Sequence, residues 1–372
     1  MKFVVISSAP IVIINGKYYM YGPYQKEMKI WAKYAGKIQF CCPIWQEDRG
    51  LLIDEISFPI SNTIELNEFD IKSFKKIHLA LYYSILNFFI ILKAIKSADH
   101  LHIRCPGNMA LLACLAQLFY PKKIKTAKYA GNWDPKSVQP WSYRLQKWIL
   151  SNAFLTKNMQ VLVYGVWANQ TKNIKPFFTA TYAESDKKEV PIRGFLGRIR
   201  FLFVGMLSEG KQPLYAAELI RDLVSKAYNV QIDYFGDGEF RKEIEKFIIN
   251  NNLNNRIILH GNQSKETVEK AYQESHFVIL PSKSEGWPKV VAEAMFWGCV
   301  PVVTQVSCVP YMLDEGKRGI LLQSNFADNI EILERCLTEE KEYHDKAKNA
   351  MLWSRKYTLD TFEKEIEKMF FS

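Results

Sequence analysis

Several patterns that identify common protein classes are missing from this 372-residue sequence. Its seven cysteines include no Cys-x-x-Cys pair, and most lie among apolar residues, as in LLACLAQLF. An odd number of cysteines in such surroundings argues against a disulfide framework or a zinc site and favours a reducing compartment. No Gly-x-Gly-x-x-Gly follows a predicted strand, which disfavours a nicotinamide or flavin cofactor.

Long apolar runs are scarce as well. The run Leu79–Leu92 has 14 residues without a charge, fewer than the ~20 that span a bilayer. We expect a buried helix there, and the alternative is a helix that lies in the membrane interface. The first residues, MKFVVISSAPIVIING, have some features of a signal peptide but fit a first buried strand and its loop better.

Positive charge is abundant, and it is concentrated in the first half. The net charge of +10 arises from 25 Lys/Arg against 13 Asp/Glu in residues 1–190, because residues 191–372 hold 24 against 26. Such a field suits an anionic partner, namely nucleic acid, a phosphorylated substrate or an anionic membrane surface, although it also serves solubility. No RNA-binding motif or Arg-rich cluster is present, so we expect no nucleic acid partner.

Strand and helix patterns alternate along the chain. In the first half, strands are expected at 2–7, 37–44, 100–105, 123–131 and 159–165, with helices at 71–96, 108–119 and 142–152. Alternation resumes at 199–304, after an irregular segment at 176–198 that reads as a linker, and 351–371 reads as an amphipathic helical tail. This spacing predicts parallel sheets covered on both faces.

The fold class is therefore α/β, with two doubly wound, Rossmann-like domains. We expect an N-terminal domain at 1–180, joined by a C-terminal helix at about 355–372, and a C-terminal domain at 195–354. Ligands of open α/β sheets bind outside the carboxyl ends of the strands. Two such domains predict an active site in a cleft between them.

Two glycine-containing turns follow strands of the second domain. In FVGMLSEGK, Gly205 ends a strand and Lys211 precedes the expected helix start at Pro213, so free N–H groups and a cation would meet an anion there. The alternative is an ordinary turn with a solvated lysine. In YFGDGEF, Gly236 again follows a strand, and Asp237 either faces a ligand or helps to cap the next helix.

The segment SEGWPKVVAE places two carboxylates around a helix start. Glu285 lies in the loop after a strand, Pro288 suits the first turn of a helix, and Glu293 lies inside that helix. N–H groups near Pro288 to Val291 can hold a phosphate, whereas carboxylates beside it suit sugar hydroxyls. This combination favours a nucleotide-sugar ligand. The alternative is a solvated Glu285 and a surface pair between Glu293 and Lys289.

Residues 199–330 resemble the C-terminal domain of glycosyltransferase family 4 (group 1). The resemblance is carried by FVGMLSEGK, YFGDGEFRKEIE, IILHG and VILPSKSEGWPKVVAEAMFWGCVPVV in this order, and by the turn between Gly316 and Gly319. It implies a GT-B fold and a retaining, metal-independent, hexosyltransferase-type enzyme that needs no cofactor and uses a nucleotide-diphosphate sugar as donor. The chain has no Asp-x-Asp, which agrees with a site that holds no metal.

The resemblance also implies residue roles. Glu285 would hold donor-sugar hydroxyls, and Lys211 would bind the diphosphate, so both are candidate catalytic residues. Glu293 would accept from the ribose hydroxyls. The remaining donor-binding candidates are the loop glycines, the segment near the base and the helix start: Gly205, Gly236, His260, Gly261, Asn262, Gly286, Trp287, Pro288, Lys289 and Val290.

This chain departs from the family pattern at two points. Met206 stands where the family usually has an Arg, so one cation for the diphosphate is missing or comes from elsewhere. The N-terminal domain also lacks a His at the turn AGNWDP. Asn132 or Asp134 would take that polar catalytic role, or Asp134 would only cap the turn before Pro135.

The expected function is sugar transfer to an acceptor hydroxyl in the synthesis of a cell-surface polysaccharide or glycolipid. The alternatives are a GT-B-fold sugar-nucleotide epimerase and a non-catalytic nucleotide-sugar-binding protein. The acceptor would be a carbohydrate or a polyprenyl-diphosphate-linked sugar. The enzyme would be cytoplasmic or peripheral on the inner face of the cell membrane.

An anionic membrane surface would meet the basic N-terminal domain. The segment Pro121–Lys128 (PKKIKTAK) would supply cations to it. The interfacial aromatics would be Tyr18, Tyr19, Tyr21, Trp31 and Trp141. The alternative is a solvated basic face with aromatics in the core.

Overall fold

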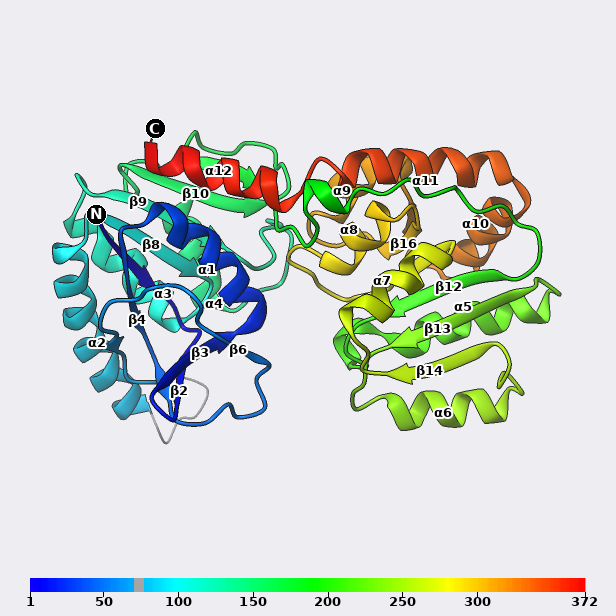
Figure 1. Cartoon of the computed structure of the whole chain (residues 1–372), viewed down its shortest axis with the longest axis horizontal. Helices are drawn as coiled ribbons and strands as arrows, with labels where there is room; N and C mark the ends of the chain where they lie inside the picture. Colours follow the sequence, from blue (N-terminus) through cyan, green and yellow to red (C-terminus); the bar gives the residue numbers. More distant parts are fainter. Residues whose placement is uncertain (70–76, 372) are drawn as a thin grey trace. The chain divides into compact units, whose positions relative to one another are not determined.

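The chain forms two compact units in the computed structural model, which describes residues 1–69 and 77–371. The first unit comprises Met1–Phe177 with Glu363–Ser372, and the second comprises Phe178–Phe362. The change of unit at 177/178 falls inside the expected linker, and the residues that follow it pack with the second unit. The end of the chain returns to the first unit (Figure 1).

A seven-stranded parallel sheet forms the centre of the first unit, in the order β11-β10-β9-β8-β1-β4-β7. Five of these strands match expected ones, because each is an apolar, β-branched run between loop residues. The strands are β1 (Lys2–Ile6), β4 (Lys37–Cys42), β7 (Ile64–Glu65), β8 (His100–Cys105), β9 (Ile124–Tyr129), β10 (Met159–Tyr164) and β11 (Ile174–Phe177).

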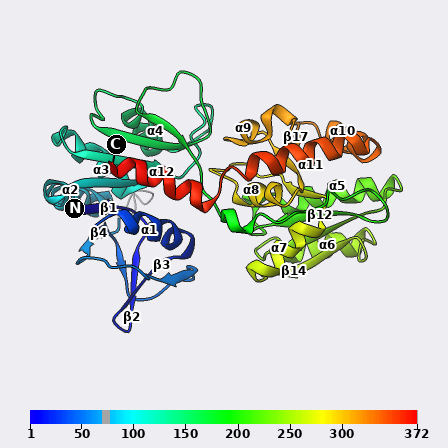
Figure 2. The ribbon, with the colours of Figure 1, turned by 45° about the horizontal axis from the view of Figure 1, so that its top comes forward.

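Helices cover both faces of this sheet. One face packs against α2 (Ile77–Ser97), α3 (Asn108–Ala116) and α4 (Trp141–Leu150), and a short 3₁₀ turn, η2 (Gln117–Phe119), follows α3. The other face packs against α1 (Gly22–Tyr34) and α12 (Leu359–Phe371), as the rings of Phe3, Trp31 and Phe370 show by lying within 6 Å of one another. Figure 2 shows α1 and α12 on this second face.

Part of the first unit was not predicted from the sequence. A small four-stranded sheet, in the order β5-β2-β3-β6, consists of β2 (Ile11–Ile14), β3 (Lys17–Tyr21), β5 (Ile44–Trp45) and β6 (Ile53–Glu55). These strands have two to five residues each, too few to show a period. Helix α1 was also missed, since its apolar positions are interspersed with lysines and its start has no capping side chain.

A helix was expected at 71–96, and the expectation that its run Leu79–Leu92 is buried was wrong. Residues 71–76 lie outside the described residues, and α2 runs from Ile77 to Ser97. One face of α2 packs on the sheet, but Leu81, Tyr82 and Phe89 on the opposite face are each about 60% exposed. The apolar run is continuous because the outward face, which nothing in the described chain covers, is as apolar as the inward one.

The segment Pro121–Lys128 was expected to supply cations to a membrane surface, with a solvated basic face as the alternative, and neither holds for two of its four lysines. Lys125 and Lys128 point into the interior from β9 and are each 1% exposed. Lys123 donates to the carbonyl oxygens of Lys96 and Ala98 at the end of α2. These three lysines therefore serve the fold, because they lie on a central strand and at a helix end. Of the expected interfacial aromatics, Trp31 is a core residue with no exposed surface.

The second unit is built on a six-stranded parallel sheet in the order β14-β13-β12-β15-β16-β17. The strands are β12 (Ile199–Val204), β13 (Val230–Phe235), β14 (Ile257–Gly261), β15 (Phe277–Leu280), β16 (Val300–Thr304) and β17 (Ile320–Leu322). Helices α5 (Pro213–Ser225), α6 (Arg241–Asn250), α7 (Lys265–Glu274), α8 (Lys289–Phe296), α9 (Val309–Leu313), α10 (Phe326–Thr338) and α11 (Glu340–Ser354) surround it.

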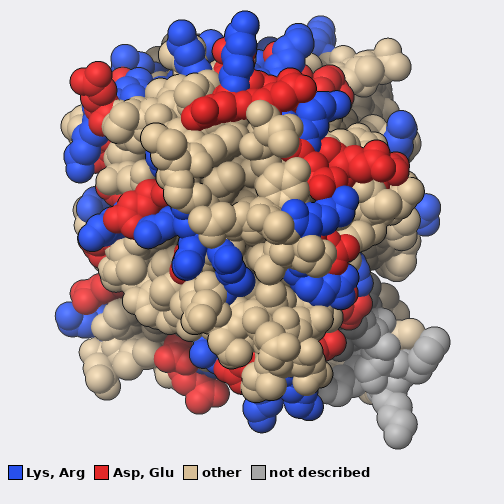
Figure 3. All heavy atoms as spheres, turned by 90° about the vertical axis from the view of Figure 1, so that its right-hand side faces the viewer, with Lys and Arg blue, Asp and Glu red and all other residues tan. Residues whose placement is uncertain are grey.

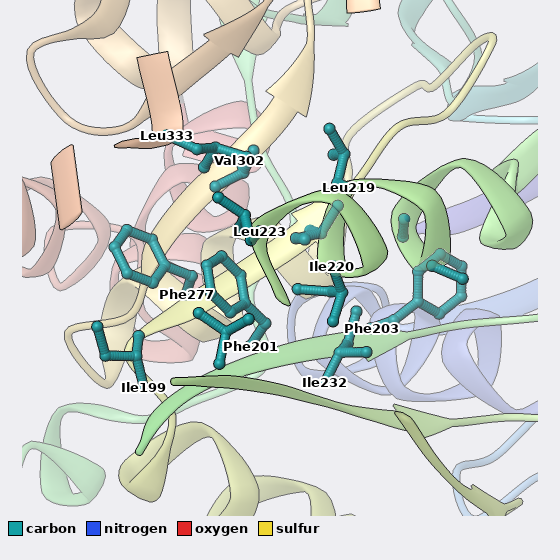
Figure 4. Close-up of a cluster of buried hydrophobic side chains, with 14 of the residues drawn as sticks. Ile199, Phe201, Phe203, Leu219, Ile220, Leu223, Ile232, Phe277, Val302 and Leu333 are labelled. Atoms are coloured by element: carbon teal, nitrogen blue, oxygen red, sulfur yellow. The ribbon is translucent and has the colours of Figure 1, made fainter. Parts of the chain in front are cut away.

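Alternate residues of these strands fill the core of the second unit. Phe201 and Phe203 of β12 and Ile232 of β13 point toward Ile220 of α5, with Phe277 of β15 stacked on Phe201 at 4.8 Å (Figure 4). The two-residue period of strands places these side chains on one face. The other face holds Leu202 and Val278 in a separate cluster. Both faces are thus apolar, as the runs in the sequence predict.

Two expected boundaries shift in the structure. Residues 178–198 contain only the 3₁₀ turn η3 (Glu184–Asp186), yet Tyr182 is 5% exposed and stacks on Phe296 at 4.6 Å. The expected tail helix at 351–371 is interrupted, because α11 ends at Ser354 and α12 begins at Leu359. Thr358 accepts from Thr361 N and so starts α12 as a new helix.

The loops at the carboxyl edge of the second sheet approach each other very closely. Gly205 N donates to Phe235 O, and Gly236 N donates to Gly261 O. A Cβ on Gly236, whose φ is +138°, would lie 2.0 Å from Gly205 O. At Gly205, with φ of +146°, a Cβ would meet no atom within 4 Å. Gly236 is therefore required by the approach of two loops, and Gly205 by its backbone conformation alone.

A cluster of charged side chains is buried in the first unit between α1 and the sheet. The Glu27 carboxylate lies 2.9 Å from Lys128 Nζ and 3.6 Å from the guanidinium of Arg104, which also lies 4.0 Å above the ring of Tyr24. Burial alone would raise the pKa of Glu27, but the two cations hold this pKa at about 2. Burial lowers the pKa of the adjacent His102 to about 3, so this imidazole is neutral.

We expect Glu27→Gln to destabilise the protein by about 3–5 kcal/mol at neutral pH, because two buried cations lose the carboxylate that pairs with both of them. The folded pKa of about 2 lies below the ordinary value of 4.5, so Glu27 contributes stability above pH 4.5 that is lost as pH falls toward 2. The difference between wild type and variant should shrink over this interval in chemical denaturation. Glu363→Gln, which breaks the more exposed pair with Lys33, should cost less than about 1 kcal/mol.

We expect Gly205→Ala to cost about 1–3 kcal/mol through backbone strain alone. Gly236→Ala should cost at least about 2 kcal/mol more, since its methyl group would overlap a carbonyl oxygen. Thermal unfolding of the two variants measures the difference. Equal losses would contradict the close approach of the loops.

Candidate functional site

The order of the strands in the second sheet decides which loops meet. Strand β12 is flanked by β13 on one side and by β15 on the other, so the chain direction across the sheet reverses between β12 and β15. Crossover connections leave opposite faces at such a reversal, and the loops there open a crevice for ligands. The loops after β12 (205–212) and β15 (281–288) are therefore neighbours, although about 75 residues separate them in the sequence.

Backbone and side chains join these two loops. Lys283 N donates to Gly210 O at 2.9 Å, and Lys283 Nζ pairs with Glu209 at 2.6 Å. Lys211, at the end of the 3₁₀ turn η4 (Glu209–Lys211), forms an ion pair with Glu285. The Glu285 side chain is 10% exposed and that of Lys211 is 31% exposed, so the pair is accessible mainly on the lysine side.

The loop around Gly286 is held from the next strand. Ser307 Oγ donates to Gly286 O at 3.1 Å, and Thr304 Oγ1 donates to Ser282 O at 2.5 Å. Both donors follow or end β16, the strand beside β15. These bonds fix the backbone on either side of Glu285, so its carboxylate is held toward Lys211 before any ligand binds.

Helix α8 begins at Lys289, with Pro288 as its N-cap residue. Val290 lies in its first turn, where the helix dipole favours an anion. The predicted start at about Pro288 therefore agrees with the structure within one residue. The Trp287 side chain is 7% exposed and packs against Trp353 and Tyr357, so only its backbone belongs to the loop surface.

Glu293 contacts two side chains of the second unit. Its carboxylate accepts from Thr181 Oγ1 at 2.7 Å and from Tyr272 OH at 3.2 Å. It borders a cavity of about 10 Å³, which has room for about one water molecule. Burial, and then the Glu293 carboxylate, raises the pKa of Tyr272 well above its ordinary value, so the phenol stays protonated and donates.

The segment expected near the base lies at the end of β14. The ring of His260 stacks on Phe235 at 4.5 Å, and its Nε2 is 2.8 Å from Asp233 Oδ1. Gly261, with φ of +68°, accepts from Gly236 N, and Asn262 is exposed just after it. His260, Gly261 and Gly236 are thus brought together at one edge of the sheet.

Asp237 does not cap the helix that follows it. Its Oδ1 accepts from Gly238 N at 2.8 Å, and its Oδ2 lies 3.4 Å from Arg241 Nη1. Helix α6 begins with Phe240 as the N-cap residue, without a side-chain cap. The alternative of a capping Asp237 was therefore wrong, because its carboxylate points toward Arg241, the first residue of the helix.

Asn132 and Asp134 lie in the first unit and hold their own loop together. Asn132 Oδ1 accepts from Asp134 N at 2.9 Å, and Asp134 Oδ1 accepts from Lys136 N at 2.8 Å. Lys147 Nζ donates to Asp134 O at 2.8 Å. These bonds agree with the alternative in which Asp134 stabilises the turn before Pro135.

Sequence reasoning missed the contribution of Lys283, Glu209 and Ser307 to this site. Lys283 stands two residues before Glu285 in the same loop, so its position was readable, but its neighbour in the other loop was not. Ser307 has φ of +52°, a backbone conformation that could not be predicted from the sequence. Both depend on the adjacency of β12, β15 and β16.

Comparison with known proteins finds similarity to glycosyltransferases. Residues 185–353 match the family described as glycosyl transferases group 1. An uncharacterized glycosyltransferase of Methanocaldococcus jannaschii is 30% identical over 141 residues, which cover 37% of this chain and 38% of that protein. The UDP-Gal:alpha-D-GlcNAc-diphosphoundecaprenol alpha-1,3-galactosyltransferase of Escherichia coli is 28% identical over 155 residues, or 40% and 39% of the two chains. The chain thus spans less than two fifths of each of these curated relatives.

A solved structure extends the likeness to the whole chain. HepE of Anabaena, crystallised with UDP and glucose, superposes with a TM-score of 0.69 at 15% identity and covers 100% of both chains. This likeness confirms the predicted GT-B fold class with its two Rossmann-like units. The match to the glycosyl transferases of group 1 extends over residues 185–353, which lie in the second unit.

Proposed function

We propose that this protein is a glycosyltransferase that moves a sugar from a nucleotide-diphosphate sugar to an acceptor hydroxyl. The observation that carries this proposal is the Lys211–Glu285 pair, held between the loops where the strand order reverses. Both residues of the pair lie within residues 185–353, which match the group 1 model. The name of the E. coli relative and the UDP and glucose in the HepE crystal support a nucleotide-sugar donor.

The pair has chemistry for both ends of such a donor. The Lys211 ammonium has three N–H groups, so it can keep its contact with Glu285 and donate to a diphosphate oxygen. The Glu285 carboxylate has lone pairs left to accept from sugar hydroxyls. Gly205 leaves open space above the first loop, and the start of α8 adds a positive dipole end.

The proposed reaction retains the configuration of the sugar. The bond between the anomeric carbon and the diphosphate oxygen breaks, while the acceptor oxygen bonds to that carbon from the same face. The acceptor proton passes to the departing diphosphate. Lys211 stabilises the charge that develops on the leaving group, so the reaction needs neither a carboxylate nucleophile nor a metal.

Lys283 is the proposed source of the second cation that Met206 does not supply. Its backbone N–H donates to the loop that carries Lys211, and its side chain is 52% exposed and pairs with Glu209. A diphosphate entering between the two loops would offer Lys283 a more highly charged partner than one surface carboxylate.

Glu293 keeps its proposed contact with the ribose hydroxyls. Its carboxylate accepts two hydrogen bonds in the structure and has capacity for more. Because the adjacent cavity holds only about one water, ribose would have to displace Thr181 or Tyr272 from it.

The acceptor proposed is a carbohydrate or a polyprenyl-diphosphate-linked sugar, and the printed substrate of the E. coli relative supports the second. An acceptor of this kind resides in a membrane. We therefore propose a cytoplasmic enzyme that is peripheral on the inner face of the cell membrane. Asn132 and Asp134 are kept as proposed polar residues on the acceptor side.

The first test is a thermal-shift and hydrolysis screen over nucleotide-diphosphate sugars, beginning with UDP-glucose and UDP-galactose. A donor that binds the folded protein should raise its melting temperature, and the enzyme should release nucleoside diphosphate. Lys211→Ala and Glu285→Gln should each lower turnover by about 10²–10³-fold. The matched control Lys226→Ala, which breaks a lysine–glutamate pair elsewhere in the second unit, should leave turnover unchanged.

Three outcomes would contradict the proposal. Near-normal turnover in both site variants would remove the pair from the mechanism. Conversion of the sugar nucleotide without release of nucleoside diphosphate would instead indicate an epimerase, and donor binding without either reaction would indicate a non-catalytic binding protein.

Lys283→Ala should lower turnover by about tenfold and raise the concentration of donor needed for half-saturation, because one diphosphate contact is lost. Lys283→Arg should restore most of the activity. A Glu209→Gln variant separates the two roles of Lys283, since it removes the surface pair and leaves the cation. If Lys283→Ala and Glu209→Gln lower turnover and raise the half-saturating donor concentration to the same extent, Lys283 stabilises the loop and does not contact the donor.

A further inference from the structure

The outward face of α2 is an apolar stripe on the surface of the first unit. Leu81, Tyr82, Ile85 and Phe89 are each between 53% and 63% exposed, at spacings that place them on one side of the helix. The residues on the opposite side are buried against the sheet and α3: Ala80, Asn87, Ile91, Ala94 and Ile95. Figure 1 shows α2 as the outermost helix of this unit.

Such a helix is unusual in a soluble environment. A helix that is apolar on all sides normally lies in a protein core or in lipid. Helix α2 is long and apolar enough to cross a membrane by composition, yet only 22% of its most apolar window is buried. Its inward side covers the sheet, so the helix cannot leave the fold. Its outward side is therefore expected to contact an apolar environment at the surface of the protein.

Charge around the stripe has a single sign. Helices α2, α3 and α4, which lie side by side on this face, contain no Asp or Glu. Between Ile77 and Lys157 the sequence has 11 Lys/Arg and only two carboxylates, Asp99 and Asp134. Within residues 1–69 and 77–371, no carboxylate pairs with Lys93 or Lys96, which continue the stripe toward the end of α2.

The neighbouring helix α4 repeats the combination. Trp141 and Trp148 are each about 60% exposed, and the exposed Arg144 lies between them on the same side of the helix. Tryptophan is enriched where a protein meets the interface of a membrane, and arginine pairs with its phosphates. Phe119 is 68% exposed and adds apolar surface after α3. The centroid of its ring lies 6.3 Å from that of Phe88 in α2.

The opposite face of the same sheet has another character. Helix α12 carries three glutamates, of which Glu363 pairs with Lys33 of α1. The second unit, too, shows lysines, arginines and carboxylates interspersed on the face turned to the viewer in Figure 3. The absence of acids is therefore a property of the α2–α4 layer and not of the protein as a whole.

We propose that the α2–α4 layer docks on the surface of an anionic lipid bilayer. Leu81, Tyr82, Ile85 and Phe89 enter the boundary between headgroups and acyl chains, while Lys93, Lys96 and Arg144 meet anionic headgroups. A second copy of this chain would bring no carboxylate to these cations, because the same layer has none. A bilayer offers the apolar and the anionic zone together.

This inference identifies the surface by which the proposed enzyme would bind a membrane. The binding itself does not depend on the proposed function, whereas its biological role rests on that function. This surface replaces the segment Pro121–Lys128 as the membrane contact, because two lysines of that segment are buried. A peripheral enzyme held in this way would meet a lipid-linked acceptor where that acceptor is anchored.

Vesicle flotation of the full chain tests the proposal, with phosphatidylcholine vesicles that contain or lack phosphatidylglycerol. The wild type should float with the anionic vesicles. Ile85→Glu/Phe89→Glu should lower the bound fraction roughly tenfold or more, since two carboxylates enter the apolar stripe. Lys93→Glu/Lys96→Glu should remove the preference for anionic vesicles and its dependence on salt.

The matched control is Ile249→Glu on α6 of the second unit, which is 64% exposed and should float like the wild type. Unchanged melting temperatures establish that the variants are folded. Absence of wild-type flotation, or equal flotation of the Ile85→Glu/Phe89→Glu variant, would overturn the proposal.

Two further measurements separate this proposal from others. The first is sedimentation without lipid. If the wild type is a dimer and the Ile85→Glu/Phe89→Glu variant is a monomer, the stripe binds a second copy, and bilayer docking is overturned. Donor hydrolysis in solution should be the same in wild type and variant. Loss of donor hydrolysis in a wild type that still floats would refute the proposed enzyme and leave the docking surface intact.

Discussion

The reversal of strand order between β12 and β15 is the constraint on which the candidate site depends. It makes neighbours of two loops that the sequence separates, and a backbone hydrogen bond from Lys283 N to Gly210 O then joins them. Only because of this tie can a lysine of one loop face a carboxylate of the other. The close glycine contact at Gly236 keeps the third loop in the same layer.

Both units have a parallel sheet covered by helices, but their lysine–glutamate ion pairs serve different purposes. In the second, the ion pair of Lys211 and Glu285 lies at a loop surface, where a ligand can compete for the lysine. In the first, Glu27 is enclosed with two cations and serves the fold, because a buried charge without a partner is costly. The same pairing of residue types is thus a candidate site in one place and a structural element in the other.

Much of the fold could be read from the sequence, since buried parallel strands are continuous apolar runs that need no partner to be recognised. Strands β8 and β10 are examples, because their bounds agree with the expected ranges within one residue. The short strands β2, β3, β5 and β6 could not be read, because two to five residues show no period. The burial of α2 was misjudged for a related reason. An apolar side chain has the same identity whether it faces a core or an uncovered surface.

By itself, the sequence determined the α/β class, the strand-loop-helix setting of Lys211 and Glu285 and the resemblance to the group 1 glycosyltransferases, because these follow from local patterns and spacing. The tertiary structure alone decided which loops meet, that Glu293 contacts Thr181 and Tyr272, that Lys125 and Lys128 are buried, and that α2 is exposed on one face. Each of these depends on the order of strands in a sheet or on what covers a helix. Both are set by contacts between segments far apart in the chain.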